Sequence, residues 1–158
     1  MKKEGMCTIL IIYHSQSGHT EKMARAVARG AGSIEGVRVM LKQAAEAGME
    51  DLVGCDGLVI GSPEYFGYMA GMIKDFFDRT YEAARGRKEV FKKPYAVFIS
   101  AGNDGNGALT QIERICLGYQ FKKIYDPVIV KGEVDRDALS RCNELGKIIA
   151  AGCREGIY

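Results

Sequence analysis

Apolar positions along the chain follow two different periods, and the two alternate from one end of the chain to the other. Uninterrupted apolar or β-branched runs at residues 8–12, 58–60 and 96–99 are typical of strands buried on both faces of a parallel sheet. Residues 37–42 alternate apolar with polar side chains, which predicts a strand whose edge or faces meet solvent. A fifth strand is predicted at residues 124–130, where a proline is tolerated only at the opposite edge or at a bulge.

Between the predicted strands, apolar residues recur at spacings of three and four, which is typical of helices that place one face on a sheet. These helices are predicted at residues 20–31, 72–84, 109–116 and 139–153. Residues 43–54 are short and alanine-rich, and they predict a single helical turn or a short helix. The alternation over residues 1–158 predicts one α/β domain, in which a doubly wound, five-stranded parallel sheet carries helices on both faces.

The first turn, residues 13–20, joins an apolar strand to a helix and is rich in hydroxyl groups. Gly18 lets backbone N–H groups approach a ligand, and the helix that follows begins with unpaired amides at the positive end of its dipole. Such a turn can hold a phosphate without Lys or Arg, and it contains neither. The predicted phosphate-binding residues are Ser15, Gln16, Ser17, Gly18, His19 and Thr20. The alternative is a turn whose hydroxyls only cap the helix.

The amino-acid sequence of this turn excludes two kinds of nucleotide-binding loop. A nucleoside-triphosphate loop needs a glycine, four residues and then Gly-Lys-Ser/Thr, and a dinucleotide loop needs three glycines at fixed spacing. The turn at residues 13–20 has one glycine and no lysine. A single terminal phosphate therefore suits it better than a pyrophosphate.

Two further loops should face the first turn, because doubly wound sheets bind ligands beyond the carboxyl ends of their strands. Residues 61–69 carry three aromatic side chains on a turn shaped by proline and glycine, where a flat ring could pack. Residues 100–107 are rich in N–H donors that suit the polar edge of such a ring. The candidates are Pro63, Glu64, Tyr65, Phe66, Gly67 and Tyr68 in one loop, and Ser100, Ala101, Gly102, Asn103 and Asp104 in the other. A hydrophobic partner surface and a flexible capping turn are the alternatives for these two loops.

The first turn resembles the signature of the flavodoxin superfamily. The matching positions are two aliphatic residues followed by Tyr13, Ser15, Gly18 and Thr20, with Ala24 and Val27 on the helix. The resemblance implies FMN as the cofactor and a flavodoxin-like sheet in the order 2-1-3-4-5. In that order the alternating strand and the proline-containing strand lie at opposite edges, which agrees with the apolar pattern.

A second part of the chain narrows this resemblance. Gly61-Ser62-Pro63, Phe66-Gly67, Met69-Ala70 and residues 74–80 are similar to NAD(P)H:quinone oxidoreductases of the tryptophan-repressor-binding-protein type and to NADPH-dependent FMN reductases. Glu64-Tyr65 and Tyr68 depart from that group, which usually has Thr-Arg and Asn there. Electron-carrying flavodoxins typically cover one flavin face with an aromatic side chain from the loop at residues 100–107. This loop has none, so we expect one face to be open.

The resemblance implies an FMN enzyme that takes hydride from NAD(P)H and passes electrons to a quinone or another small acceptor. The flavin carries the difficult step, so no catalytic side chain and no metal ligand is predicted. Two alternatives stay open: a flavodoxin that carries electrons to a protein partner, and a nonenzymatic FMN-binding sensor or interaction module. A response-regulator receiver is excluded, because Tyr13-His14 and Gly61-Ser62 stand where it needs acidic residues.

The composition of the chain argues against several further classes of protein. The formal charge of +2 comes with neither the long basic run expected for nucleic-acid binding nor the acidic field of carrier flavodoxins. No apolar segment reaches the roughly 18 residues that a membrane span requires. Five cysteines, an odd number without metal-ligand spacing, fit thiols in a reducing compartment. We therefore expect a cytoplasmic protein, with a dimer or tetramer as the open choices for assembly.

Overall fold

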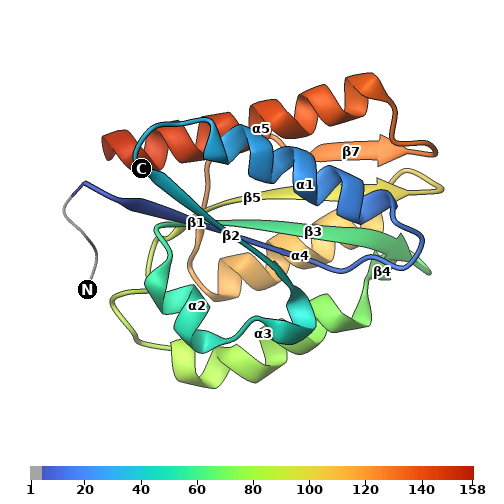
Figure 1. Ribbon diagram of the computed structural model, residues 1–158. Coiled ribbons are helices and arrows are strands. Elements are labelled where there is room, and N and C mark those ends of the chain that lie inside the picture. The colour runs from blue at the N-terminus through green and yellow to red at the C-terminus, as the bar shows by residue number, and fades with distance from the viewer. Residues whose placement is uncertain (1–4) are drawn as a thin grey trace.

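A twisted sheet forms the middle layer of the protein and helices cover both of its faces (Figure 1). The computed structural model describes residues 5–158. The strands are β1 (Cys7–Tyr13), β2 (Val37–Gln43), β3 (Gly57–Tyr65), β4 (Tyr68–Met69), β5 (Pro94–Ala101), β6 (Lys122–Lys123) and β7 (Val128–Lys131). The helices are α1 (His19–Gly32), α2 (Met49–Gly54), α3 (Gly71–Ala84), α4 (Asn106–Gly118) and α5 (Arg136–Glu155), with a 3-10 turn, η1 (Ala44–Glu46).

The strand order is β2-β1-β3-β5-β6, with β7 also paired to β5, and all of these pairs are parallel. This is the predicted flavodoxin-like order, and the predicted α/β fold with helices on both faces is confirmed. The alternating segment, now β2, lies at one edge of the sheet as expected. All parallel strands therefore point their carboxyl ends to the same side, which becomes the site edge.

The predicted number of strands is wrong, since the structure has seven rather than five. Of the segment predicted as strand five, residues 124–130, only the last part forms a strand, β7, while β6 lies just before the segment; both strands pair with β5. Pro127 lies in the gap between them and has no N–H to donate to the ladder. The other addition is β4, a two-residue strand that folds back antiparallel onto the end of β3.

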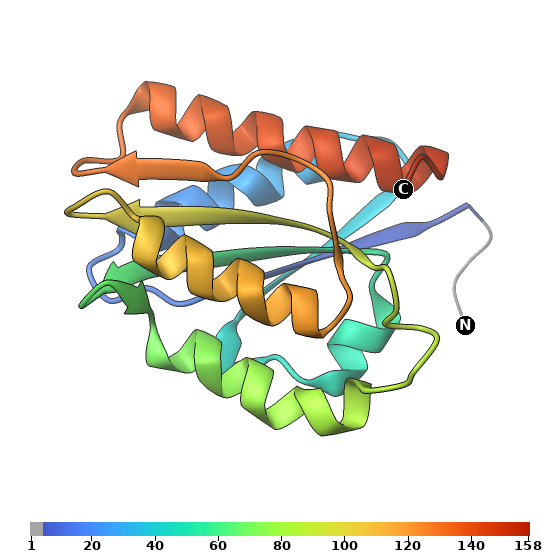
Figure 2. The same cartoon turned by 180° about the vertical axis from the view of Figure 1, so that it is seen from behind.

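The two faces of the sheet are covered by different helices. Helices α1 and α5 lie together on one face, and α2, α3 and α4 cover the other (Figures 1 and 2). On the first face α1 and α5 touch backbone to backbone, because a Cβ added at Gly30 would lie 1.9 Å from the carbonyl oxygen of Asn143. A Cβ added at Gly146 would lie 2.1 Å from the carbonyl oxygen of Val27. This close contact fixes the direction of α1 and hence the place of the turn before it.

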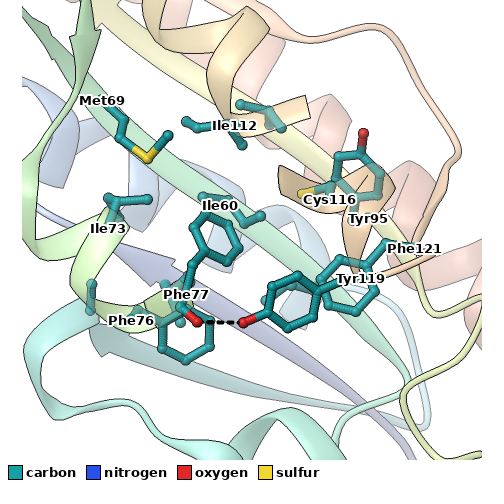
Figure 3. Packing of buried hydrophobic residues seen from close by; sticks show 14 of the residues in the cluster. Ile60, Met69, Ile73, Phe76, Phe77, Tyr95, Ile112, Cys116, Tyr119 and Phe121 are labelled. Carbon is teal, nitrogen blue, oxygen red and sulfur yellow. Dashed lines mark hydrogen bonds between the residues drawn. The ribbon is translucent and has the colours of Figure 1, made fainter. Parts of the chain in front are cut away.

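The second face holds an aromatic cluster beneath α3 and α4 (Figure 3). The rings of Phe77 and Tyr119 lie 5.6 Å apart, and those of Tyr119 and Phe121 stack at 4.9 Å. The Tyr119 hydroxyl donates to the carbonyl of Phe77 at 2.7 Å and lies 2.7 Å from the hydroxyl of Thr80. Burial raises the pKa of Tyr119 to about 12.

No helix within residues 5–158 is both long enough and apolar enough to cross a membrane.

Candidate cofactor site

The turn between β1 and α1 has the geometry of an anion cradle. Gly18 precedes the helix with φ 97°, and a Cβ there would have open space around it. Its N–H donates to Ser15 Oγ at 3.2 Å, which closes the turn on itself. No side chain caps α1, and its first intrahelical bond starts from the N–H of Lys22. The amides of the first turn of α1 are therefore available to an anion.

A buried pair of hydroxyls joins this turn to the end of β5. Thr20 Oγ1 and Ser100 Oγ lie 2.8 Å apart, and both residues are buried. The two residues are 80 positions apart in sequence, and the parallel sheet brings them together because β1 and β5 both flank β3. Each hydroxyl can donate one hydrogen bond. One of the two donates to the other, so the second hydroxyl can donate to an anion at the mouth of the turn.

The loop after β3 is a two-residue β-hairpin. Tyr65 pairs with Tyr68, and the residues between them, Phe66 and Gly67, have φ values of 53° and 70°. Two successive positive φ values are typical of a type I′ turn, which matches the twist of a hairpin. The Phe66 side chain is fully exposed, and a non-glycine residue is uncommon in this conformation.

This hairpin is held against the start of α4. Glu64 Oε2 accepts a hydrogen bond from the N–H of Ala108 at 3.1 Å, so the carboxylate lies at the positive end of the helix. A Cβ added at Gly107 would lie 2.0 Å from the carbonyl oxygen of Gly67, so only glycine allows this approach. Asp104 accepts from the N–H of Asn106 at 3.0 Å. Both carboxylates of the site loops are thus engaged by α4.

The first and second loops also contact each other. The ring centroids of His14 and Tyr65 are 6.2 Å apart in an edge-to-face arrangement, and the N–H of His14 donates to the carbonyl of Gly61 at 3.2 Å. Burial raises the pKa of Tyr65 above its usual value. The three loops therefore meet at the carboxyl edge of the sheet, at the end where the strand arrows point in Figure 1.

The predicted site residues divide by exposure. Nine of them present their side chains or backbone to solvent: Gln16, Ser17, His19, Phe66, Gly67, Tyr68, Gly102, Asn103 and Asp104. Ser15, Gly18, Glu64 and Tyr65 are partly buried. Thr20, Pro63, Ser100 and Ala101 are buried. The structure brings all three predicted loops to one edge, and their contact with a cofactor stays a prediction.

Three supporting residues were not among the predicted site residues. Gly107 and Ala108 receive the hairpin, and Gly61 lies under the ring of Phe98, where a Cβ would be 2.0 Å from the ring. Each acts through a contact between segments far apart in sequence. The signal for Gly107 was a second glycine shortly after Gly105, which by itself reads as an ordinary turn.

The residues present fit an FMN phosphate. The first turn offers unpaired amides and a hydroxyl pair, and none of the three loops contains Lys or Arg. The flat surfaces of Tyr65 and Tyr68 lie on the adjoining hairpin, where a ring could pack. A phosphate at the turn and a flat ring at the hairpin are the two halves of a flavin mononucleotide.

The order of the sheet and the loops at its carboxyl edge define a flavodoxin-like protein. A model of the NADPH-dependent FMN reductase family matches residues 7–127. The chain therefore belongs to the NADPH-dependent FMN reductase family, and the predicted resemblance to such flavoproteins is confirmed.

Three similar proteins define the neighbourhood of the chain. A flavodoxin of Aquifex aeolicus is 41% identical, over 92% of this chain and 86% of the relative. An NAD(P)H dehydrogenase (quinone) of Acidithiobacillus ferrooxidans is 33% identical, over 68% of this chain and 63% of the relative. An archaeal flavodoxin structure superposes with a TM-score of 0.83 at 23% identity, over 93% of this chain and 99% of that one. The last similarity supports the fold.

Proposed function

We propose that the protein is an FMN-dependent oxidoreductase that takes hydride from NAD(P)H and delivers electrons to a quinone or another small acceptor. The family model and the quinone dehydrogenase relative support this reaction class. The observation that carries the proposal is the loop after β5. Gly102, Asn103 and Asp104 are exposed there, and no aromatic side chain lies between Ser100 and Gly107.

An open loop matters because hydride transfer needs close stacking. The nicotinamide ring must lie flat with its donor carbon about 3 to 3.5 Å from the accepting atom. An aromatic lid would occupy the same space. Small, exposed residues at positions 102–104 leave that space to a second ring.

The residues of the chain bind and orient the cofactor in this proposal. The first-turn amides of α1 and the Thr20–Ser100 hydroxyl pair hold the phosphate. Tyr65 and Tyr68 pack beside the ring and exclude water from it, and the Glu64–Ala108 bond keeps their hairpin in place. FMN supplies the acceptance of hydride and its release as electrons. No side chain is assigned a proton transfer.

A flavodoxin-type electron carrier is the second candidate function. The 41% identity to the Aquifex flavodoxin over 92% of the chain favours it. The charge of this chain disfavours the carrier function, since a net charge of +2 provides little steering toward a basic redox partner. The fully exposed Phe66 beside the site would serve either role as a contact for an incoming molecule.

Turnover of the FMN-loaded protein with a soluble benzoquinone and either NADPH or NADH tests the proposal. We expect steady quinone reduction, and a loss of about tenfold or more in Asn103→Trp, which inserts an aromatic side chain into the open loop. Lys147→Trp on the outer surface of α5 is the matched control and should keep full turnover. Absence of turnover with either nucleotide, in protein that holds FMN, would contradict the enzyme assignment.

A further inference from the structure

A cavity of about 710 Å³ lies at the amino edge of the sheet, opposite the cofactor loops. It is formed by the end of α3, the loop that leads into β5, and the end of α4. Its size falls within the range of about 300 to 1,000 Å³ that is typical of small-molecule sites. The lining residues are Tyr81, Ala84, Arg85, Gly86, Arg87, Lys88, Val90, Phe91, Gly118, Tyr119 and Gln120. We call this space the amino-edge cavity.

The charge of the amino-edge cavity has one sign. Arg85, Arg87 and Lys88 line it, and no carboxylate does. Glu82 and Glu89 approach two of these cations from outside, at 3.8 Å and 3.1 Å. Within residues 5–158, Lys88 forms no ion pair. The cavity therefore favours a ligand that carries negative charge.

Aromatic rings form the walls of the amino-edge cavity. Tyr81 and Tyr119 meet edge to face, with ring centroids 5.3 Å apart. Tyr119 is held by its hydroxyl and by stacking on Phe121, so this wall is rigid (Figure 3). Phe91 lines the cavity from the loop, and about half of its surface is exposed. Rings at these positions suit the flat face of another aromatic group.

The loop that closes the cavity is ordered by its own bonds. Turn hydrogen bonds run from Arg87 to Ala84 and from Val90 to Arg87. The buried Lys93 side chain donates to the carbonyl of Cys55, which ties the loop to the end of α2. These contacts hold the backbone that carries the cations and Phe91 in a defined arrangement.

Backbone strain also gathers at this place. Three non-glycine residues of the described chain have positive φ, and two of them, Lys92 (57°) and Gln120 (62°), lie at the amino-edge cavity or the residue next to it. The N–H of Lys92 donates to the carbonyl of Gln120 at 2.9 Å, so the two strained residues hold each other. Backbone strain of this kind clusters at active sites and ligand sites, where the surrounding structure holds the strained residues in place.

We propose that the amino-edge cavity is a second ligand site, for a planar aromatic anion of one or two rings. The ring would stack between Phe91 and the tyrosine wall, and the carboxylate or phosphate would meet Lys88 and Arg85. The site is separate from the cofactor loops, since all parallel strands present their carboxyl ends to the other side. A ligand bound there would therefore not be a substrate of the flavin chemistry.

Titration calorimetry with 2-naphthoate tests this site directly. We expect one binding site, unchanged by saturating FMN, and little binding of the uncharged 2-naphthalenemethanol. Phe91→Ala and Lys88→Glu should each weaken naphthoate binding by about fivefold or more, because one removes a stacking ring and the other reverses a charge. Tyr125→Ala removes another half-exposed aromatic side chain, outside the cavity, and should leave the affinity unchanged.

Three results would overturn the proposal. Competition by FMN would place naphthoate at the cofactor loops instead. Equal affinity in Phe91→Ala, Lys88→Glu and the parent protein would show that binding occurs elsewhere. Sedimentation that shows a dimer in the parent and a monomer in Phe91→Ala, without naphthoate binding, would assign the cavity to a second copy of the chain.

Discussion

The two edges of the sheet present different groups to negative charge. At the carboxyl edge the cradle consists of backbone amides, glycine and two hydroxyls, and its three loops contain no Lys or Arg. At the amino edge the amino-edge cavity presents three cationic side chains over aromatic walls. The first arrangement is set by the helix and sheet themselves, whereas the second depends on long side chains that can move.

This difference has a consequence for what each edge can do. Amides at a helix start are preorganised, so they hold a cofactor at little ordering cost and keep the field around it mild. Flexible cations over rings accept a broader set of flat anions. The geometry of the carboxyl edge is therefore set by the backbone, and that of the amino edge depends on side-chain conformation.

The largest expected effect breaks the carboxyl edge alone. Thr20→Val keeps the shape of the side chain but removes the hydroxyl that meets Ser100 and the predicted phosphate. Loss of a hydrogen bond to a charged group costs about 1.5 to 3 kcal/mol, so FMN affinity should fall by about ten- to a hundredfold. Fluorescence titration of FMN measures the change.

Thr110→Val on α4 changes an exposed threonine and is the control for this experiment. Binding of 2-naphthoate to Thr20→Val should remain as in the parent. Equal FMN affinity in the Thr20 variant and the control would remove the hydroxyl pair from the cofactor site.

A second variant loosens the hairpin from α4. Gly107→Ala would place a Cβ 2.0 Å from the carbonyl oxygen of Gly67, so the hairpin must shift. Overpacking of this kind costs about 1 to 3 kcal/mol, and thermal unfolding should begin several degrees lower, at about 2 to 4 °C per kcal/mol. Calorimetric melting measures it.

Gly118→Ala at the other end of α4 has open space around the new methyl group and serves as the control. It should melt at or slightly above the parent temperature, because alanine favours helix over glycine. A Gly107→Ala protein as stable as this control would mean that the hairpin is not packed on α4.

At the amino edge, Tyr119 should make stability depend on alkaline pH. Its pKa is raised by burial from 10.0 to about 12, so the folded state keeps the proton that the unfolded chain loses. This contribution is complete below pH 10 and disappears as the pH rises to about 12, with a total on the order of 2 kcal/mol. Urea unfolding across this range measures the loss.

Tyr119→Phe should lose about 1 kcal/mol at neutral pH, because two hydrogen bonds of the hydroxyl disappear. It should also be less sensitive to alkaline pH than the parent. Tyr125→Phe, at a half-exposed tyrosine, should match the parent at every pH. An alkaline slope that Tyr119→Phe leaves unchanged would assign the effect to other buried groups, such as Tyr95, whose pKa is also raised by burial.

The smallest expected effect concerns Glu64. Its carboxylate bonds to the N–H of Ala108, so Glu64→Gln keeps a hydrogen-bond acceptor and removes only the charge at the helix start. A helix-dipole interaction of this kind is worth about 0.3 to 1 kcal/mol. We expect a small loss in the free energy of unfolding and little change in the reduction potential of the flavin. A shift of that potential by many tens of millivolts would instead place the carboxylate at the flavin ring.

The parts of the fold that depend on local patterns could be predicted from the sequence. Strand and helix positions follow from apolar periods that each segment carries alone, and the strand order was implied by the resemblance to flavodoxins. The short β4 could not be predicted, because it needs Phe66 at positive φ, which phenylalanine rarely adopts. The bounds of β6 and β7, on either side of Pro127, could not be predicted either. They depend on the pairing of both strands with β5, which is distant in sequence.

The candidate site shows the same limit. The first turn is a continuous motif, so phosphate binding could be predicted from residues 13–20 alone. The Thr20–Ser100 pair joins two distant loops, and only the topology brings them within hydrogen-bond distance. The amino-edge cavity is assembled from three segments and was missed. Its signal was five cations within residues 85–93, a run too short to suggest nucleic-acid binding.

The most direct test of the proposed function is anaerobic mixing of the FMN-loaded protein with one equivalent of NADPH, and separately of NADH, followed by flavin absorbance. We expect complete bleaching in a single two-electron process with at least one nucleotide. Bleaching should be much slower in Asn103→Trp, while dithionite should reduce both proteins equally. No bleaching by either nucleotide, with reduction by dithionite in two separate one-electron steps, would contradict the proposed function and identify an electron carrier.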